Sequence, residues 1–393
     1  MSGVDDADGA DGAAGLAHPV DPAHPAGGAG PTLGVEEEYL LLNRESGRPC
    51  PRVDEVRSAA RDIPFLHRSE VGNELLQAQI EIATPVCGDL AEVAGRLTRL
   101  RETVVSAADR AGCRLAATGA APFAPEGAVP VSPEQRYRDM RAQAGRLVDE
   151  QLICGMHVHV AVPDRERGAA ALGRIRPWLP VLLALGANSP FWDGRDTGFA
   201  GWRTIVSDRW PVTGPPPYTA DGADYARETS ALLASGVIAD LGQVYWHARL
   251  SESYPTLEVR VCDVQLDADA AVTLAGLARA LVATALREAA EGTEPIASGD
   301  AVLRAAAWHA ARHGVTGTLV HPVRGTLARA DEVVDAFTAR LAPALRSTGD
   351  LARVTAGVDR LRAQGGGATR QRAAAAASGL DGLLRTTSAA GTG

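Results

Sequence analysis

The amino-acid sequence predicts an α+β protein built on a mostly antiparallel sheet. Two pairs of strand-like segments, at about 68–84 and 243–264, follow each other without an intervening helix. Several strand-like segments alternate apolar with ionisable residues, which is typical of an antiparallel sheet with one face toward water. No G-x-G-x-x-G motif opens a helix after a strand, so a Rossmann unit is not expected.

The predicted elements can be placed in chain order. A strand begins near Gly34 and continues into Leu42, and a pair of strands covers about 68–84. Asp89 is a good helix cap, and the apolar residues after it keep helical spacing up to Gly112, which predicts a helix between them. Further strands are expected at 113–118, 153–160, 243–250 and 257–261, and further helices at 133–150, 164–187, 267–290, 300–313, 331–346 and 349–363.

Both ends of the chain differ in composition from the middle. Residues 1–30 and 364–393 are rich in Ala and Gly, with little to bury, so we expect a disordered tail at each end. Residues 31–363 are expected to fold as a single domain. Within it, residues 189–220 form a long irregular segment that holds half of the six Trp residues, which argues against disorder. We expect this segment to be a lid or substrate loop.

Composition and charge exclude several classes of protein. The net charge of −9 and the pI near 5.5 argue against a nucleic-acid-binding surface. No apolar run approaches the length of a membrane span, and the N-terminus lacks a secretory signal, so we expect a cytoplasmic protein. The five cysteines are scattered, as reduced thiols would be. All 39 basic residues are arginine, which excludes a phosphate-loop lysine and a lysine nucleophile.

Three of the predicted strands each place two ionisable residues on one face. Side chains two residues apart on an extended backbone point the same way. This pairs His157 with His159 on the strand at 153–160, Glu36 with Glu38 on the first strand, and Glu258 with Arg260 on the strand at 257–261. The pattern predicts a polar cavity lined by the sheet.

Each of these groups also has an ordinary explanation. Successive glutamates are most often a solvated patch, a lone buried histidine is most often a core residue, and Glu258 with Arg260 can be a cross-strand ion pair. Glu81 lies between two isoleucines, so it must be paired, metal-bound or facing water. Taken together, several carboxylates and an imidazole without a cysteine cluster favour Mg²⁺ or Mn²⁺. Such ions beside arginines can hold a nucleoside triphosphate.

Over about residues 31–345 the chain resembles the carboxylate–amine ligases of the second glutamate–cysteine ligase family, which are distant relatives of glutamine synthetase. Four motifs carry the resemblance: G-x-E-x-E at Gly34–Glu38, E-x6-E-I-A-T-P at Glu74–Pro85, G-M-H-V-H at Gly155–His159 and L-E-V-R-V-C-D at Leu257–Asp263. The resemblance implies a curved antiparallel sheet that forms an active-site funnel with helices packed outside. It also implies ATP and Mg²⁺ or Mn²⁺ at opposite parts of that funnel, and makes the single domain a catalytic one.

The same resemblance implies roles for individual residues. It makes metal ligands of Glu36, Glu38, Glu81, His157 and Glu258, with Glu74 as a further candidate. It places His159 near the nucleotide and Arg260 at the transferred phosphoryl group or the substrate carboxylate. Glu258 and Arg260 are thus the candidate catalytic residues. In the loop, the candidates for binding a substrate anion are Arg195, Arg203 and Arg209.

The implied reaction joins two small-molecule substrates. The carboxylate of L-glutamate attacks the γ-phosphate of ATP to give an acyl phosphate, and the amine of L-cysteine then displaces phosphate to give γ-glutamylcysteine. Three alternatives stay open: a ligase for a different amine acceptor, a guanidino or other small-molecule kinase of the same fold, and a non-catalytic binding protein. A homodimer is an expectation from the family. No nucleic acid and no membrane is expected as a partner.

Overall fold

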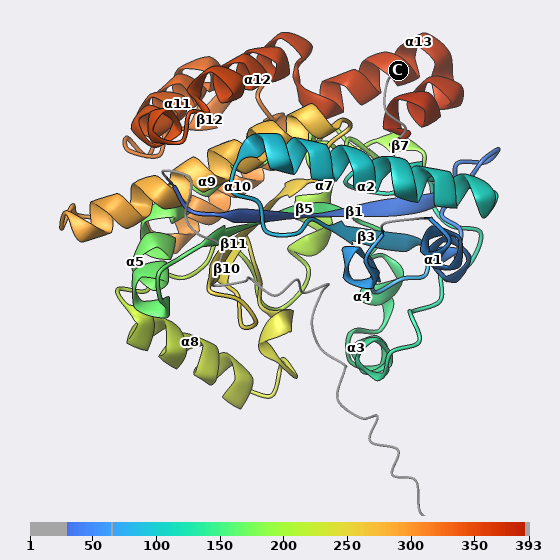
Figure 1. Cartoon of the computed structure of the whole chain (residues 1–393), viewed down its shortest axis with the longest axis horizontal. Coiled ribbons are helices and arrows are strands. Elements are labelled where there is room, and N and C mark those ends of the chain that lie inside the picture. The colour runs from blue at the N-terminus through green and yellow to red at the C-terminus, as the bar shows by residue number, and fades with distance from the viewer. Residues whose placement is uncertain (1–29, 64–65, 390–393) are drawn as a thin grey trace, which may run out of the picture.

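The structure is a computed structural model that describes residues 30–63 and 66–389. A seven-stranded sheet lies at its centre (Figure 1). Its strand order is β10-β11-β5-β1-β3-β2, with β4 also paired to β1, and every printed pairing within it is antiparallel. The strands are β1 Leu33–Asn43, β2 Val71–Asn73, β3 Gln79–Ala83, β4 Cys113–Ala116, β5 Gly155–Ala161, β10 Ala248–Leu250 and β11 Thr256–Asp263. The predicted antiparallel α+β architecture is confirmed.

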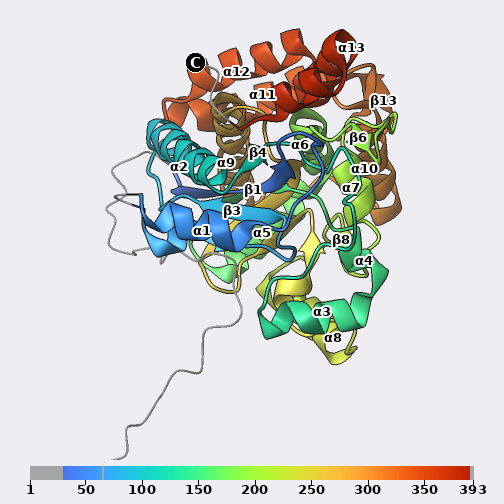
Figure 2. The ribbon, with the colours of Figure 1, turned by 90° about the vertical axis from the view of Figure 1, so that its right-hand side faces the viewer.

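One face of the sheet is covered by two long helices, α2 (Leu90–Arg110) and α9 (Ala268–Ala290). Asp89 caps α2 as predicted, because its side chain accepts hydrogen bonds from two backbone N–H groups of the first turn. Outside this layer lie α11 (Ala330–Ser347), α12 (Leu351–Gln364) and α13 (Gly366–Thr387), as Figures 1 and 2 show. The opposite face of the sheet is therefore the one left for a site.

The remaining helices lie around the edges of the sheet and on its other side, where α3, α4 and α8 are found (Figures 1 and 2). They are α1 Val53–Arg61, α3 Gln135–Ala144, α4 Arg146–Asp149, α5 Arg165–Ile175, α6 Leu179–Gly186, α7 Trp202–Ser207, α8 Gly222–Ala234 and α10 Asp300–His313. Three two-stranded ladders complete the described part: β6 Phe191–Trp192 with β7 Arg195–Asp196, β8 Thr213–Gly214 with β9 Tyr245–Trp246, and β12 Thr318–Val320 with β13 Leu327–Arg329.

The structure differs from the sequence prediction at several helices. The helix expected at 133–150 is divided into α3 and α4 at Gly145, whose φ of 55° ends the first of them. By contrast, the break that Pro177 and Pro180 predict within the helical region 164–187 is present, as a 3₁₀ turn at Arg176–Trp178 between α5 and α6. Helix α8 was not predicted. The loop 189–220 is less irregular than expected, because it contains β6, β7, α7 and β8.

The prediction of a disordered tail from residue 364 onward was wrong for most of that segment. Helix α13 occupies Gly366–Thr387 and packs onto the core. Gln371 is fully buried, and its amide donates to the backbone and side-chain oxygens of Asn188 at 2.9 and 2.7 Å. A β-carbon at Gly367 would collide with the Asn188 side chain. The Ala and Gly residues that indicated disorder therefore allow a close helix contact instead. The tail expected at the N-terminus, up to residue 29, lies outside the described residues.

Among the described helices, α9 alone is long and apolar enough to cross a membrane by length and composition. Its most apolar window is 83% buried inside the protein. It also carries Arg279, which is buried and paired with Asp350 of the turn before α12. These properties are those of the central helix of a folded core.

Candidate active site

Four adjacent strands, β11, β5, β1 and β3, bring the predicted site residues together. In the antiparallel register, Glu36 of β1 faces His157 of β5, His159 of β5 faces Glu258 of β11, and Glu38 of β1 faces Glu81 of β3. Residues directly opposite each other on paired strands project from the same face of a sheet. This face is the one opposite α2 and α9, because Glu37, the residue between the two acids, contacts Arg101 of α2. The expected polar, sheet-lined face is present.

The first group of donors, which we call the Glu36 cluster, comprises Glu36, His159 and Glu258. One ligand atom from each lies within 4.8 Å of the others. The Nε2 atom of His159 is 3.3 Å from Oε1 of Glu36 and 3.9 Å from Oε1 of Glu258. Burial alone would raise the pKa of Glu36, but the charge and hydrogen bonds of the two histidines beside it hold that pKa well below its ordinary value. The cluster therefore carries ionised carboxylates.

The second group, the Glu38 cluster, comprises Glu38, Glu74 and Glu81, again with one oxygen from each within 4.8 Å. Glu38 and Glu81 are direct cross-strand neighbours, a position at which like charges destabilise a sheet. Burial, and then the charge of Glu38, raise the pKa of Glu74 to about 7. Three acids within this distance, two of them buried, form the kind of oxygen-rich site that suits Mg²⁺ or Mn²⁺.

His157 lies between the two clusters. Its Nδ1 atom is 3.2 Å from Oε2 of Glu36 and 3.7 Å from Oε1 of Glu258, while its Nε2 atom is 3.7 Å from Oε1 of Glu38. Burial and the nearby charge of Arg260 lower the pKa of His157, which favours the neutral ring. A neutral imidazole is the form that can coordinate a metal ion. Either nitrogen is placed to complete the neighbouring cluster.

Arginines limit the negative charge at one side of the Glu36 cluster. Arg260 is hydrogen-bonded to Glu258, and Nε of Arg249 donates to Oε2 of Glu258 at 2.7 Å. Burial opposes ionisation of Glu258, but these two cations hold its pKa well below the ordinary value. The ion pair between Glu258 and Arg260, which the sequence analysis considered as an alternative, is therefore present. The Glu258 carboxylate is also part of the Glu36 cluster. The register of β11 shifts between Val259 and Cys262, a β-bulge of the kind that re-aims side chains beside active sites.

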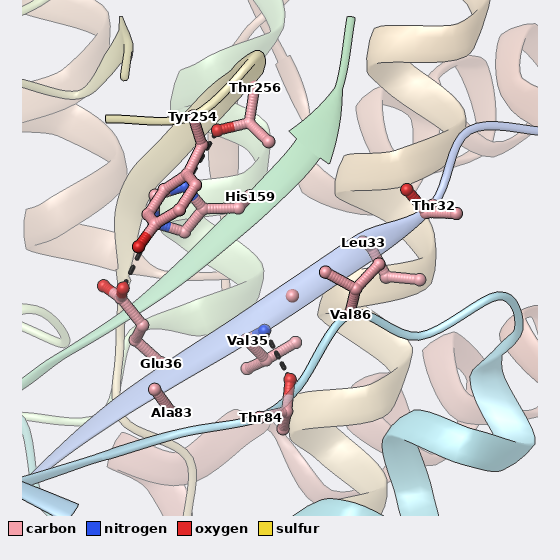
Figure 3. A pocket seen from close by; sticks show the side chains of 11 residues that line it. Thr32, Leu33, Val35, Glu36, Ala83, Thr84, Val86, His159, Tyr254 and Thr256 are labelled. Atoms are coloured by element: carbon pink, nitrogen blue, oxygen red, sulfur yellow. Dashed lines mark hydrogen bonds and ion pairs between the residues drawn. The ribbon is translucent and has the colours of Figure 1, made fainter. Parts of the chain in front are cut away.

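A pocket adjoins the Glu36 cluster (Figure 3). It lies at one end of the sheet face that carries both clusters, which is the candidate catalytic face. The pocket has about 450 Å³ of empty space, a volume that includes open solvent. Glu36, His159 and Tyr254 stand along one side of it. The opposite side is mostly apolar and is formed by Leu33, Val35, Ala83 and Val86. The pocket can therefore accept a flat apolar group whose charged end reaches the cluster.

The three loop arginines that were predicted to bind a substrate anion lie in different environments. Arg203 is mostly buried, and its Nη2 atom donates to the backbone oxygen of Arg260 at 3.2 Å. Arg209 instead forms an ion pair with Glu150, and Arg195 is exposed. Only Arg203 of the three is in hydrogen-bond contact with the strand of the site.

Sequence reasoning missed Arg249, which the register places directly opposite Glu258. A signal for it existed, because His247 and Arg249 share one face of the strand predicted at 243–250. It also missed Tyr254 at the pocket. That residue lies in the turn before β11, where no periodic pattern marks it.

Comparison with known proteins agrees with the fold and the motifs. The sequence profile of glutamate-cysteine ligase family 2 matches residues 32–387. A protein of Mycolicibacterium vanbaalenii named "Putative glutamate--cysteine ligase 2-2" is 44% identical over 344 residues, covering 88% of this chain and 93% of that protein. A protein of Streptomyces coelicolor named "Putative glutamate--cysteine ligase 2" is 43% identical over 348 residues, covering 87% and 93%.

Solved structures share the fold. A glutamate–cysteine ligase from Francisella tularensis in complex with AMP superposes with a TM-score of 0.67 at 10% identity, covering 91% of this chain and 87% of that one. A bifunctional glutathione synthetase from Pasteurella multocida gives a TM-score of 0.63 at 15% identity, covering 92% of this chain and 52% of that one. At such low identity these two likenesses establish the architecture alone.

Proposed function

The chain belongs to glutamate-cysteine ligase family 2, and on this premise we propose that it is an ATP-dependent ligase that joins L-glutamate to L-cysteine. The products are γ-glutamylcysteine, ADP and phosphate. One observation carries the proposal: two acidic clusters on one sheet face are linked by His157 and bordered by Arg260. Phosphoryl transfer needs this combination of metal ligands and a fixed cation.

Divalent cations fit the donor sets of this site. The Glu36 cluster and the Glu38 cluster each offer three donor atoms, and His157 lies within reach of both. Mg²⁺ or Mn²⁺ held there would neutralise phosphate oxygens and orient the triphosphate. The pKa of Glu74, raised by burial and then by the charge of Glu38, supports this assignment, since a bound cation would offset both effects.

ATP is proposed to enter through the pocket beside the Glu36 cluster. Its apolar side, with Leu33 and Val86, suits the adenine ring, and His159 stands at the edge nearest the cluster (Figure 3). This places the triphosphate over the acids of the catalytic face. It also agrees with the expectation that His159 lies near the nucleotide.

Arg260 is proposed to stabilise charge on the phosphoryl group as it moves from ATP to the substrate carboxylate. Its guanidinium is held by Glu258 and therefore needs no rearrangement during the reaction. The chain has no lysine that could take this role. The acyl phosphate formed in the first step is then attacked by the amine. Hydrolysis of that intermediate by water would compete with this attack, and an enclosed face reduces it.

The substrates are small molecules, and we further propose that the enzyme works in the cytoplasm without a nucleic-acid or membrane partner. The acidic net charge of −9 favours this assignment. A single catalytic domain and a homodimeric state are further proposals. Helix α13 belongs with that domain in space, because it packs on Asn188.

The proposal is tested by incubating the full chain with ATP, Mg²⁺ and L-glutamate, with and without L-cysteine, and measuring phosphate release and product mass. Cysteine-dependent phosphate release with the mass of γ-glutamylcysteine supports it. Release that depends on another amine in a panel of amino acids indicates a ligase with a different acceptor. A stable phosphorylated product formed without any amine indicates a small-molecule kinase. No nucleotide or metal binding at all indicates a non-catalytic binding protein.

A further inference from the structure

Arg203 is a buried cation without a close carboxylate partner. It lies in α7, and its side chain is only 12% exposed. The nearest carboxylate oxygen, Oδ1 of Asp263, is 3.9 Å from Nη1, beyond hydrogen-bonding distance. Its Nε atom is buried and has no hydrogen-bond partner. Nη2 donates to the backbone oxygen of Arg260 at 3.2 Å.

This environment sets Arg203 apart from the other deeply buried arginines of the described chain. Arg101, Arg176 and Arg279 are each hydrogen-bonded to a carboxylate, namely that of Glu37, Asp300 and Asp350. Arg203 has only a long ion pair with Asp263 and an Nε atom without a hydrogen-bond partner. An incompletely hydrogen-bonded buried charge is costly, and a further acceptor from a ligand would reduce that cost.

The surroundings of Arg203 add positive charge and another unsatisfied polar atom. His247 is buried, and its Nδ1 atom lacks a hydrogen bond. Burial, and then the charges of Arg203 and Arg304, lower the pKa of His247 to about 3, so the ring is neutral. Asp208 lies 3.9 Å from Nε2 of His247, and burial raises its pKa to about 6. Near pH 7 Asp208 is mostly ionised and offsets part of this positive charge, so the groups left for a ligand are Nε of Arg203 and Nδ1 of His247.

The strand of the catalytic site fixes the position of Arg203. Oγ of Ser189 accepts a hydrogen bond from the backbone N–H of Arg203 at 2.9 Å and donates to Oδ2 of Asp263 at 2.7 Å. The backbone N–H of Asn188 donates to the same carboxylate oxygen at 2.7 Å. Asp263 is the last residue of the L-E-V-R-V-C-D motif, which also contains Arg260. Through Asn188 and Ser189, this motif therefore fixes the start of the loop 189–220. We regard Asp263 as a positioning residue.

Arg203 also lies next to the Glu38 cluster and away from the pocket. Its guanidinium packs over Gly155, where a β-carbon would collide with it. The backbone N–H of that glycine donates to Oε2 of Glu38 at 2.6 Å. Gly155 and His159 are four residues apart on β5, which corresponds to about 13 Å along an extended strand. The nucleotide pocket and Arg203 thus mark opposite ends of the same catalytic face.

We propose that Arg203 binds the α-carboxylate of an amino-acid substrate. The inference rests on the proposed ligase function, which requires two amino acids beside the phosphoryl group. The planar guanidinium is suited to a carboxylate, and its free Nε is positioned to contribute one of the two N–H groups of a bidentate contact. The carboxylate comes either from L-glutamate or from L-cysteine, and the experiment distinguishes the two.

The test compares Arg203→Met, Arg203→Lys and the wild type, with Arg195→Met as the matched control because Arg195 is an exposed arginine of the same loop. The KM values for ATP, L-glutamate and L-cysteine are measured, and cysteamine, which lacks the carboxylate, is used as a second acceptor. Loss of a charged hydrogen bond should raise the KM of one amino acid about tenfold or more, with the KM for ATP nearly unchanged. Arg195→Met should behave as the wild type.

The two sources give different patterns. If Arg203 binds glutamate, Arg203→Met raises the KM for glutamate with either acceptor. If it binds cysteine, the variant loses kcat/KM with cysteine but not with cysteamine. Amino-acid KM values within about twofold of the wild type in a folded Arg203→Met protein overturn the inference. If Arg203→Met does not fold, Arg203→Lys decides the question. Lysine keeps the positive charge but lacks the planar guanidinium that binds a carboxylate through two N–H groups. A wild type that neither ligates nor binds these amino acids, as measured by calorimetry, refutes the proposed function itself.

Discussion

The Nδ1 atom of His157 lies 3.2 Å from Oε2 of Glu36, across directly paired positions of β5 and β1. The other ring nitrogen of His157 lies 3.7 Å from Oε1 of Glu38, two residues further along β1. One imidazole therefore contacts both acidic clusters. A change at this ring should disturb both cation sites together, whereas a change at an outlying acid should disturb one.

The first prediction concerns this imidazole. His157→Ala should lower ATP turnover by about 100-fold or more, because it removes a donor shared by both clusters. The fold should persist, since the ring lies among the site acids on the sheet face opposite α2 and α9 and not in the helix-covered core. Steady-state phosphate release and far-UV circular dichroism measure the two effects. His313→Ala, at the end of α10, is the control and should leave turnover intact. Normal turnover in His157→Ala would rule out the proposed site.

Glu258→Ala should also abolish turnover, but it is a less clean test. Its carboxylate is paired with Arg249 and Arg260, so the substitution leaves two mostly buried cations without their partner. We expect a loss of stability as well as activity, of about 3–5 kcal/mol. Denaturant unfolding separates the two losses.

The second prediction concerns metal removal. Chelation with EDTA should abolish turnover, and Mn²⁺ should restore it and raise the melting temperature of the apo protein, since a ligand that binds only the folded state stabilises it. Glu81→Gln removes one charge from the Glu38 cluster and should weaken Mn²⁺ binding, measured by calorimetry. Glu45→Gln, an exposed acid after β1, is the control. Equal Mn²⁺ affinity in the two variants would contradict the assignment of this cluster.

The site strands were predictable from sequence because their signal is local. Alternation along an extended backbone places Glu36 and Glu38 on one face whatever the rest of the chain does, and the same holds for His157 and His159. Cross-strand partners depend on register and on loop positions far away in sequence. The contact between Arg249 and Glu258, and the approach of Arg203 to the backbone of Arg260, therefore could not be predicted.

Composition misled the prediction at the C-terminus for a different reason. Small residues lower the gain from burying each side chain, so a run of Ala and Gly resembles a tail with nothing to bury. They also allow backbones to approach closely, and this is how Gly367 meets Asn188. Whether a complementary surface exists elsewhere in the chain cannot be inferred from the run itself. A polar residue in this segment, Gln371, contacts the core through its buried amide, which donates a hydrogen bond to Asn188 and attaches α13.

The third prediction concerns the middle acid of the three successive glutamates. Glu37 is fully buried on the helix side of β1, where Arg101 donates to it through Nε at 2.9 Å and the Tyr39 hydroxyl donates at 2.6 Å. Glu37→Ala should lower the free energy of unfolding by about 3–5 kcal/mol, because it leaves Arg101 buried and unpaired. Urea denaturation measures this.

A double-mutant cycle distinguishes the ion pair from simple loss of packing. Arg101→Met combined with Glu37→Ala should cost less than the sum of the two single changes, because the charge left unpaired by the first is removed by the second. Additive losses would show that the two side chains act independently.

The fourth prediction concerns the pocket. Val86→Trp should fill its apolar side and raise the KM for ATP by about tenfold, because steric exclusion removes the contact area available to the base. The KM values for the amino acids should change little, since they are proposed to bind at the other end of the face. Val302→Trp, at an exposed position on α10, is the control. An unchanged KM for ATP would place the nucleotide elsewhere.

The fifth prediction is a pH dependence at the junction of α9 and α13. Asp267 caps α9 through the N–H of Ala270 at 2.9 Å, and its other oxygen accepts from Nη1 of Arg370 at 2.7 Å. Burial opposes ionisation, but Arg370 and the cap hold the pKa of Asp267 below its ordinary value. Because the folded pKa is depressed, the stabilisation is fully present above the unfolded pKa of about 3.9 and is lost as the pH falls through the folded value.

Asp267→Asn keeps a capping side chain but removes the titrating charge. The difference in unfolding free energy between wild type and variant should therefore be constant above about pH 5 and shrink as the pH falls below about 4. Urea denaturation across this range measures it, with Asp359→Asn, at an exposed position of α12, as the control. Wild-type and Asp267→Asn curves that stay parallel down to the acid limit of folding would show that the carboxylate is not selectively stabilised in the folded state. The ion pair between Arg370 and Asp267 would then contribute nothing to the attachment of α13.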